Sequence, residues 1–474
     1  MTVAPSRRLL ILDDDPTGSQ CVAGIDVAFD EDPAIPLEVL KEPGDACFVL
    51  TNTRALDEDE AVAMNRRIVR GVLDGGIPAD GLHVVSRSDS TLRGHVIAEP
   101  LAIADELSAH GLEVDAFVLC PAMIEAGRFT DGDIHFATVE GKAVEVAETD
   151  FARDATFGYT HSDLREFLAE RSNGAIAAAD VLSLSLEDIR TGGPARVREI
   201  LGGARDRRWV VVNATEYADM EVVARVIAEL EAEGRTLVTR CAPSFVRPLA
   251  GQRGARVLGA ADIPVPADRQ EYGLVVVGSH VGLTTAQLQV VQERGTLLEV
   301  EIDVPSVLDE RREEHLAQLA ARIREALPRT DCVLYTSREL VRSEDPAESL
   351  AIARRVSDAV VEVVQQVRTA RPAWVVAKGG ITSHEVAANG LGIRRARVEG
   401  QFWEGQVSLF SAQEAPAEVL GMPYVVFPGN VGGEQALADV VDTLTAPVAA
   451  RSAAGRDRPP SRATRVCAFR PARS

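Results

Sequence analysis

The sequence predicts an α/β fold of two domains, each with a largely parallel sheet flanked by helices. Short apolar, β-branched runs alternate with long helical patterns along the chain, which is typical of strands joined by crossover helices. The chain has 474 residues, whereas a single hydrophobic core stops growing at about 250–300 residues. Residues 251–273 are rich in Gly, Pro and Asp, and a fresh α/β pattern begins after them. Such a stretch indicates a domain boundary.

Strands are expected where apolar and β-branched residues run together. In sequence order these runs are Leu9–Leu12, Cys47–Leu50, Leu82–Val85, Ala116–Leu119, Trp209–Val212, Leu274–Val277, Trp374–Ala377 and Tyr424–Phe427. Helices are expected over Asp59–Leu73, Glu99–His110, Asp219–Glu233, Arg311–Ala326 and Glu348–Val367. We therefore expect one domain over residues 1–255 and a second over 272–446. A basic tail at 447–474, rich in Ala, Arg, Ser and Pro, is expected to be disordered.

The composition of the chain restricts its possible binding partners and its cellular compartment. The formal net charge is −22, and an acidic surface repels phosphate backbones, so no nucleic-acid partner is expected. No stretch approaches 18 apolar residues, so no membrane span is expected. The six cysteines form no CxxC pair, which favours reduced thiols in a cytoplasmic protein. Apolar helix stripes are typical of a core, although they leave a homo-oligomer open.

Four expected strands of the first domain end in polar turns that carry Asp or Arg. These turns are Asp13–Ser19, Thr51–Arg54, Ser86–His95 and Pro121–Arg128. Ligands of open α/β sheets bind beyond the carboxyl ends of the strands. Four such turns at one sheet edge predict a site for a small, anionic, hydroxyl-rich molecule.

Several side chains of these turns have suitable chemistry. Arg93 suits bidentate recognition of a planar carboxylate, and Asp89 could accept a hydroxyl proton. The nearby Ser and Thr hydroxyls could bind a polyol or cap the following helix. The run Asp13–Asp15 is costly unless a metal, a cation or a transferred proton uses it; a solvated acidic turn is the alternative.

A second interpretation of the first turn is a phosphatase. The pattern Asp13-x-Asp15-x-Thr17 resembles the first motif of haloacid-dehalogenase-type phosphatases, with Asp13 as nucleophile and Asp15 as acid/base. That machinery also needs a later Asp pair and a Lys. The chain has no GDxxxD, and its three lysines are Lys41, Lys142 and Lys378.

Glycine-rich turns follow three expected strands of the second domain, at Gly278–His280, Lys378–Ser383 and Pro428–Gly433. Glycine lets backbone N–H groups approach a phosphate, and a helix N-terminus favours the anion. The P-loop pattern and the protein-kinase motifs are both absent. Lys378 could touch a phosphate or be an ordinary surface lysine.

Taken together, these motifs resemble the four-carbon acid sugar kinase family. The first domain contributes Asp13–Ser19, Ser88–Gly94 and Pro121–Arg128, and the second contributes Gly278-Ser279, Gly379–Thr382, Gly400–Gly405 and Pro428–Gly433. The resemblance runs from about residue 9 to residue 445. It implies transfer of the γ-phosphoryl group of ATP, with Mg²⁺, to the terminal hydroxyl of threonate, erythronate or an oxo-tetronate. It also implies an active site in the cleft between the domains.

The resemblance implies roles for individual residues. The base would be Asp15 or Asp89. The sugar acid would lie with Asp14, Thr17, Arg54, Ser90, Arg93, Gly94 and Arg128. ATP would lie with Ser279, Gly379, Gly380, Thr382, Gly400, Gly405, Gly429, Asn430 and Gly432. A sensor that binds the sugar acid without turnover is a further alternative.

The chain departs from the family's pattern in three turns. It has Pro16 where many members have Leu, and Ile381 where many have Asp. The family often has two prolines in the turn that here reads Gly400–Val407, and Glu404 and Gln406 replace them. These changes leave the substrate and the adenine contacts open.

Overall fold

The computed structural model describes residues 7–15, 17–338 and 346–446. The expected disorder of residues 447–474 lies outside this range. In the described part of the chain, no helix is both long enough and apolar enough to cross a membrane.

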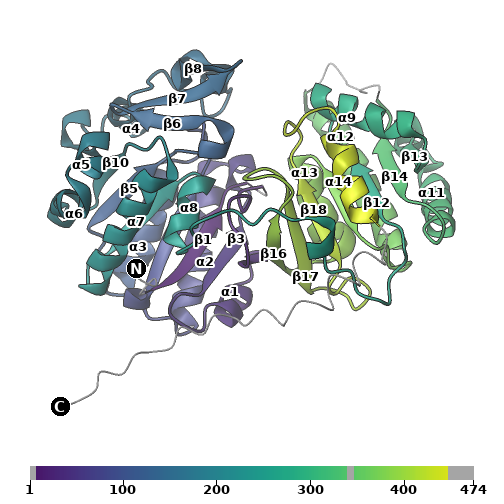
Figure 1. Ribbon diagram of the computed structural model, residues 1–474, viewed down its shortest axis with the longest axis horizontal. Coiled ribbons are helices and arrows are strands. Elements are labelled where there is room, and N and C mark those ends of the chain that lie inside the picture. The colour runs from purple at the N-terminus through teal and green to yellow at the C-terminus, as the bar shows by residue number, and fades with distance from the viewer. Residues whose placement is uncertain (1–6, 16, 339–345, 447–474) are drawn as a thin grey trace.

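A single 15-stranded sheet runs through both domains (Figure 1). The first half of the chain contributes β1 (Arg8–Asp13), β2 (Asp26–Ala28), β3 (Ala46–Leu50), β4 (Leu82–Arg87), β5 (Ala116–Cys120), β9 (Leu182–Leu184), β10 (Arg208–Val212) and β11 (Leu237–Cys241). The second half contributes β12 (Leu274–Val277), β13 (Leu298–Ile302), β14 (Cys332–Thr336), β15 (Val375–Lys378), β16 (Arg395–Gln401), β17 (Ser408–Glu414) and β18 (Pro423–Phe427). The strand order is β13-β14-β12-β15-β18-β17-β16-β2-β3-β1-β4-β11-β5-β10-β9. All pairs are parallel except β18-β17, β17-β16 and β16-β2.

The α/β prediction with largely parallel strands is confirmed, but the sequence did not predict that the two sheets join. The junction is the antiparallel pairing of β16 with β2. Strand β2 has three residues, too few for an alternating pattern to be recognised.

Helices cover both faces of the sheet (Figure 1). The helices of the first domain are α1 (Ala34–Val39), α2 (Glu58–Asp74), α3 (Ala98–Ala109), α4 (Leu164–Arg171), α5 (Leu186–Arg190), α6 (Gly193–Gly203), α7 (Tyr217–Ala232) and α8 (Pro243–Leu249). Those of the second domain are α9 (Gly282–Arg294), α10 (Val304–Leu308), α11 (Arg312–Ala326), α12 (Pro346–Arg368), α13 (Gly380–Glu385) and α14 (Ala436–Thr445). A π-helix over Val386–Leu391 continues α13.

The core of the first domain has two sides because successive strand residues point to opposite faces. Leu10 and Leu12 of β1 belong to a cluster that includes Ile68 of α2, whereas Ile11 belongs to one that includes Val223 of α7. Both faces of the strand are buried, which explains why β1 reads as a continuous apolar run.

Two segments have structure that the sequence did not predict. A small antiparallel sheet follows β5 and consists of β6 (Arg128–Asp131), β7 (Ile134–Val139) and β8 (Lys142–Glu145). The Gly/Pro-rich segment 251–273 is docked rather than free, because Leu258 and Ile263 are buried in the core of the second domain.

Candidate functional site

Two cavities meet in the structure. The first, of about 780 Å³, lies at the carboxyl ends of the first-domain strands and is closed by turns of the second domain. The second, of about 920 Å³, lies in the second domain between α12, α13 and the turn after β12. Asn430 lines both cavities. Two ligands could therefore meet at this residue.

The aspartate turn after β1 is built on a buried arginine. Asp13 and Arg87 are paired at the ends of β1 and β4, and their side chains form an ion pair. Arg87 also lies 3.5 Å from Asp14 Oδ1 and donates to the carbonyl of Asp15 at 2.9 Å. A side chain at Gly18 would collide with Arg87 and Asp13. The turn can therefore close only over a glycine.

Burial changes the titration of the first two aspartates. It raises the pKa of Asp13 to about 7 and that of Asp14 to about 6, although Arg87 acts in the opposite direction on both. Neither side chain is among the described residues that line these two cavities. The structure places Asp14 beneath the first cavity, so its predicted contact with the sugar acid is not direct.

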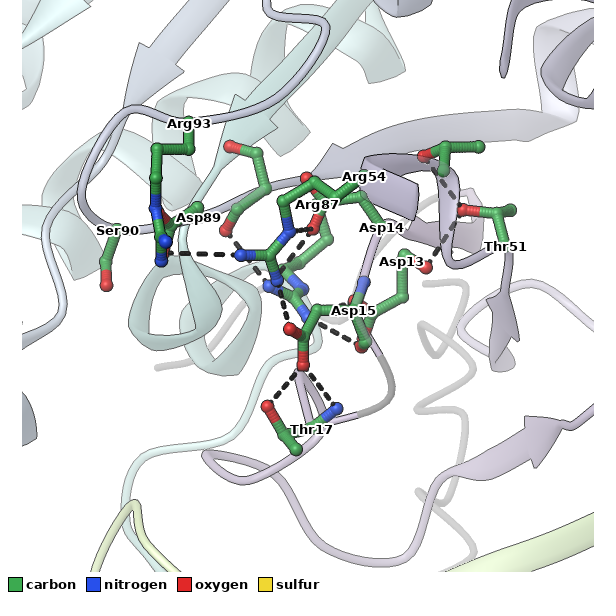
Figure 2. A network of polar contacts seen from close by, with 12 residues as sticks. Asp13, Asp14, Asp15, Thr17, Thr51, Arg54, Arg87, Asp89, Ser90 and Arg93 are labelled. Atoms are coloured by element: carbon green, nitrogen blue, oxygen red, sulfur yellow. Dashed lines mark hydrogen bonds and ion pairs between the residues drawn. The ribbon is translucent and has the colours of Figure 1, made fainter. Parts of the chain in front are cut away.

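Arg54 links three carboxylates (Figure 2). Its guanidinium lies 3.3 Å from Asp14 Oδ1 and 3.7 Å from Asp89 Oδ1, and it forms an ion pair with Asp15. Burial raises the pKa of Asp15 and Asp89, but Arg54 and other donors outweigh it and hold both below their usual range. Thr17 also donates to Asp15 through both its backbone N–H and its hydroxyl. Both candidate bases are therefore ionised and line the first cavity.

The two other arginines of the first cavity differ in their partners. Arg93 donates to Asp89 Oδ2 at 2.7 Å and lies 3.7 Å from Asp154. Arg128 donates to Ser90 Oγ at 2.7 Å, and it forms no ion pair with a carboxylate of the described residues. Both guanidinium groups lie over the ring of Phe151, at 5.6 and 5.4 Å from its centroid. Arg128 thus brings an uncompensated positive charge to the cavity.

The second cavity has a glycine turn and an apolar wall. Gly379 has φ +117°, and a Cβ atom there would lie 2.9 Å from the Cβ of Ser279. A Cβ atom at Gly278 would lie 2.5 Å from Thr382 Oγ1. The predicted residues Ser279, Gly379, Gly380, Thr382, Gly429 and Asn430 line this cavity. Helix α12 supplies the apolar side, which includes Ile352 and Val356.

Other predicted residues lie elsewhere. Gly400 is buried in β16, where a Cβ atom would lie 2.5 Å from the carbonyl of Arg256, and it lines neither cavity. Gly405 and Gly432 line the first cavity and not the second. Gly94 lies beside Asp14 and lines neither. Glycine is used in tight turns and close backbone packing as well as where the backbone approaches a ligand. The sequence alone does not show which of these two uses a given glycine has.

Lys378 is neither a phosphate contact at the cavity surface nor a surface lysine. Its side chain is fully buried, its Nζ donates to the carbonyl of Pro428 at 2.6 Å, and it lies 3.9 Å from the centroid of Phe427. Burial lowers its pKa to about 7. Lys378 supports the turn that separates the two cavities.

Sequence reasoning missed several charged residues around the first cavity. Buried Arg240 forms an ion pair with Glu99 and donates to Ser86 Oγ at 2.6 Å. Buried Arg247 lies 2.7 Å from Glu125 Oε1. An arginine inside the apolar strand β11 was the available signal for Arg240. Glu99 sits in a helix pattern where a carboxylate normally faces solvent, so nothing in the sequence marked it.

The fold and the two adjoining cavities belong to a two-domain α/β protein with one cavity lined by acidic and basic side chains and a neighbouring cavity lined by glycine turns. Residues 9–249 match the family model described as "Sugar-binding N-terminal domain". Residues 274–437 match the family model described as "Nucleotide-binding C-terminal domain". The chain belongs to the four-carbon acid sugar kinase family, which joins these two domains.

Individual relatives agree with this assignment. A D-erythronate kinase of Heliobacterium modesticaldum is 28% identical over 271 residues, which are 56% of this chain and 54% of that protein. The chain thus matches about half the length of this curated relative.

Crystal structures share the fold. A Haemophilus influenzae protein has a TM-score of 0.63 at 18% identity, over 90% of this chain and 97% of its own. A Salmonella typhimurium LT2 protein with a provisional tRNA synthase name has a TM-score of 0.65 at 18% identity, over 91% and 98%. At this identity they support the α/β architecture alone.

Proposed function

We propose that the chain is an ATP-dependent kinase that phosphorylates the terminal hydroxyl of a four-carbon sugar acid. The observation that carries the proposal is the position of Asn430, which lines the cavity with the acidic turns and also the cavity with the glycine turns. A phosphoryl donor and its acceptor must meet at such a junction. The family assignment and the D-erythronate kinase relative support the same reaction.

Arg128 is our candidate for binding the substrate carboxylate. Arg54 and Arg93 are both neutralised by aspartates of the protein, whereas Arg128 has no carboxylate partner among the described residues. A planar guanidinium binds a carboxylate through two parallel hydrogen bonds. The Ser90 hydroxyl, 2.7 Å from Arg128, would hold the guanidinium in place.

Asp15 is our candidate for the base. Both carboxylates accept hydrogen bonds from neighbouring side chains, but the side chain of Asp15 is 29% exposed, compared with 10% for Asp89. A carboxylate with a lowered pKa is a weak base. Phosphoryl transfer tolerates this, because catalysis rests mainly on positioning and charge neutralisation. Asp15 would orient the attacking hydroxyl and take its proton late.

The second cavity is our candidate site for ATP. The apolar side chains of α12 suit a nucleobase, and the turns at Gly379 and Gly429 bring backbone N–H groups to the junction. We expect Mg²⁺ to be bound chiefly by the triphosphate, where it would neutralise charge during transfer. The described residues include no group of three or more His, Cys, Asp or Glu side chains placed to hold an ion.

The geometry speaks against the phosphatase interpretation. That reaction needs Asp13 as an exposed nucleophile. Asp13 is fully buried, forms an ion pair with Arg87 and lines neither cavity. A phosphoester could not reach it without opening the turn.

The test is ADP formation with ATP, Mg²⁺ and a panel of D- and L-threonate, D- and L-erythronate and their oxo forms. The proposal predicts ADP release that depends on one of these acids. Acid-independent ATP hydrolysis, or phosphate release from a phosphoester without ATP, would contradict it. Binding of acid and ATP without turnover would instead identify a sensor.

A further inference from the structure

The turn between β16 and β17 reaches from the nucleotide-binding domain to the sugar-binding domain. Phe402 N donates to the Val407 carbonyl at 2.9 Å, and Gln406 N donates to the Trp403 carbonyl at 3.1 Å. Gly405 has φ +66°. A four-residue turn with a positive φ at its third residue is of type II. Glu404 therefore occupies the second position of this turn.

This turn forms part of the first cavity. Trp403, Gly405 and Gln406 line it together with the acidic turns of the sugar-binding domain. Gly405 packs so closely against Glu125 that a side chain there would collide with it. The sugar-acid cavity is thus completed by the other domain.

Glu404 is tied to a rigid point on the sugar-binding domain. Its Oε1 accepts from Arg247 Nη1 at 3.1 Å, and Arg247 is only 2% exposed. Arg247 is held from three other sides: by Glu125 Oε1 at 2.7 Å, by the Cys21 carbonyl at 2.7 Å, and by the ring of Tyr217 at 4.2 Å. The exposed Glu404 therefore ties the turn 402–407 to a buried side chain of the sugar-binding domain.

The second position of a type II turn, which Glu404 occupies, is one that favours proline. Proline at the second position of a type II turn fixes φ and stabilises the turn. Glutamate lacks that restriction. Glu404 N donates no backbone hydrogen bond to any of the described residues, so proline would remove none there. The ion pair is a second way to hold the turn.

We propose that the Glu404–Arg247 ion pair positions the turn 402–407 over the sugar acid. Glu404 is a positioning residue, because it acts through Trp403 and Gln406. The part of this inference that concerns acid binding rests on the proposed function. The part that concerns the order of the turn does not.

The test uses Trp403 as a reporter in the full-length protein. The other two tryptophans, Trp209 and Trp374, are buried, so a Trp403→Phe variant gives the background to subtract. Acrylamide quenching of Trp403 measures the order of the turn without any ligand. Tryptophan fluorescence titrated with the acids of the panel, and separately with ATP, measures binding without turnover.

Three variants separate the effect of the Glu404–Arg247 ion pair from the effects of turn rigidity and of interdomain ion pairs in general. Glu404→Ala removes the ion pair but leaves Arg247 paired with Glu125, so no buried charge is left alone. Glu404→Pro restores a fixed turn without the charge. Asp32→Asn is the matched control, because it breaks another ion pair between the domains, with Arg394 at 2.7 Å, and Asp32 does not line the first cavity.

The inference predicts that Glu404→Ala increases the quenching of Trp403 and weakens acid binding about threefold, as expected for a half-exposed ion pair. ATP binding should not change, Glu404→Pro should restore both properties, and Asp32→Asn should match the wild type. Unchanged quenching in Glu404→Ala would overturn the inference, as would a Glu404→Pro variant no better than Glu404→Ala. If the wild type binds no acid, the proposed function fails, while the quenching comparison still decides the inference.

Discussion

The arginines of the first cavity fall into two groups according to what neutralises them. The sequence predicted Arg93 as the main carboxylate ligand, helped by Arg54 or Arg128. Arg54 and Arg93 pair with Asp14, Asp15 and Asp89, which belong to two different turns. Arg93 and Asp89 are four residues apart, but Arg54 pairs with aspartates far from it in sequence, so no local pattern could reveal which guanidinium is left for a ligand.

Replacing Arg128 by Gln should raise the KM for the sugar acid about 30-fold, as expected for the loss of a charge-assisted hydrogen-bonded pair. The KM for ATP should change little. Arg153→Gln is the control, because Arg153 is exposed and pairs with Asp150 outside the cavity. Steady-state kinetics with each substrate varied in turn would measure this. An unchanged KM for the acid would remove Arg128 from the role.

Replacing Asp15 by Asn should lower kcat by about 10²–10⁴, the range for loss of a positioned acid or base. Arg54 would keep Asp14 and Asp89 as partners, so the fold should survive, which thermal unfolding would confirm. Asp150→Asn, at an exposed position, is the control. A kcat near the wild-type value would show that Asp15 is not the base, and the role would fall to Asp89 or to no residue.

Strands and helices were the most predictable part of the molecule. Runs such as Leu9–Leu12 are apolar because both sheet faces are covered, and they became β1 with a residue added at each end. The antiparallel strands β16 and β17 were missed. Their sequences, Arg395–Gln401 and Ser408–Glu414, mix charged and apolar residues. Their pairing with neighbouring strands stabilises them: β16 pairs with β2 across the domain junction, and β17 pairs with β16 and β18.

The turn after β15 lines the second cavity, and its shape depends on the backbone conformation of Gly379. A Gly379→Ala variant would need a Cβ atom 2.9 Å from Ser279 at φ +117°, a strain of about 1–3 kcal/mol. We expect nucleotide affinity to fall about tenfold as the turn shifts. Gly282→Ala, at the start of α9 with nothing within 4 Å of the new Cβ, is the control. Calorimetric titration with ATP would measure the change, and equal affinities would contradict it.

The buried aspartates of the first-domain turns make the free energy of unfolding of the whole molecule depend on pH. Burial raises the pKa of Asp13 from 3.8 to about 7, so between these values the folded state binds more protons than the unfolded state. Stability from this group is then lost as the pH rises from 5 to 7, by about 2 kcal/mol. Asp15 and Asp89 have lowered pKa values, and their contribution is lost only at acidic pH.

An Asp13→Asn variant should therefore lose this dependence. Urea unfolding at pH 5 and pH 7 would give the free energies, and the wild type minus the variant isolates Asp13. The subtraction matters because burial lowers the pKa of His135 to about 4, which acts in the opposite direction. If the free energy of unfolding changes by the same amount between pH 5 and pH 7 in both proteins, the raised pKa of Asp13 is wrong.

At the scale of the whole molecule, the two cavities meet at Asn430, where the proposed phosphoryl transfer would take place. The most direct measurement is ³¹P NMR of mixtures of the protein, ATP, Mg²⁺ and each four-carbon sugar acid. We predict one new phosphomonoester resonance that grows with one of the acids in equal amount to ADP. ADP and inorganic phosphate in equal amount, with no phosphomonoester from any acid, would contradict phosphoryl transfer to a sugar acid.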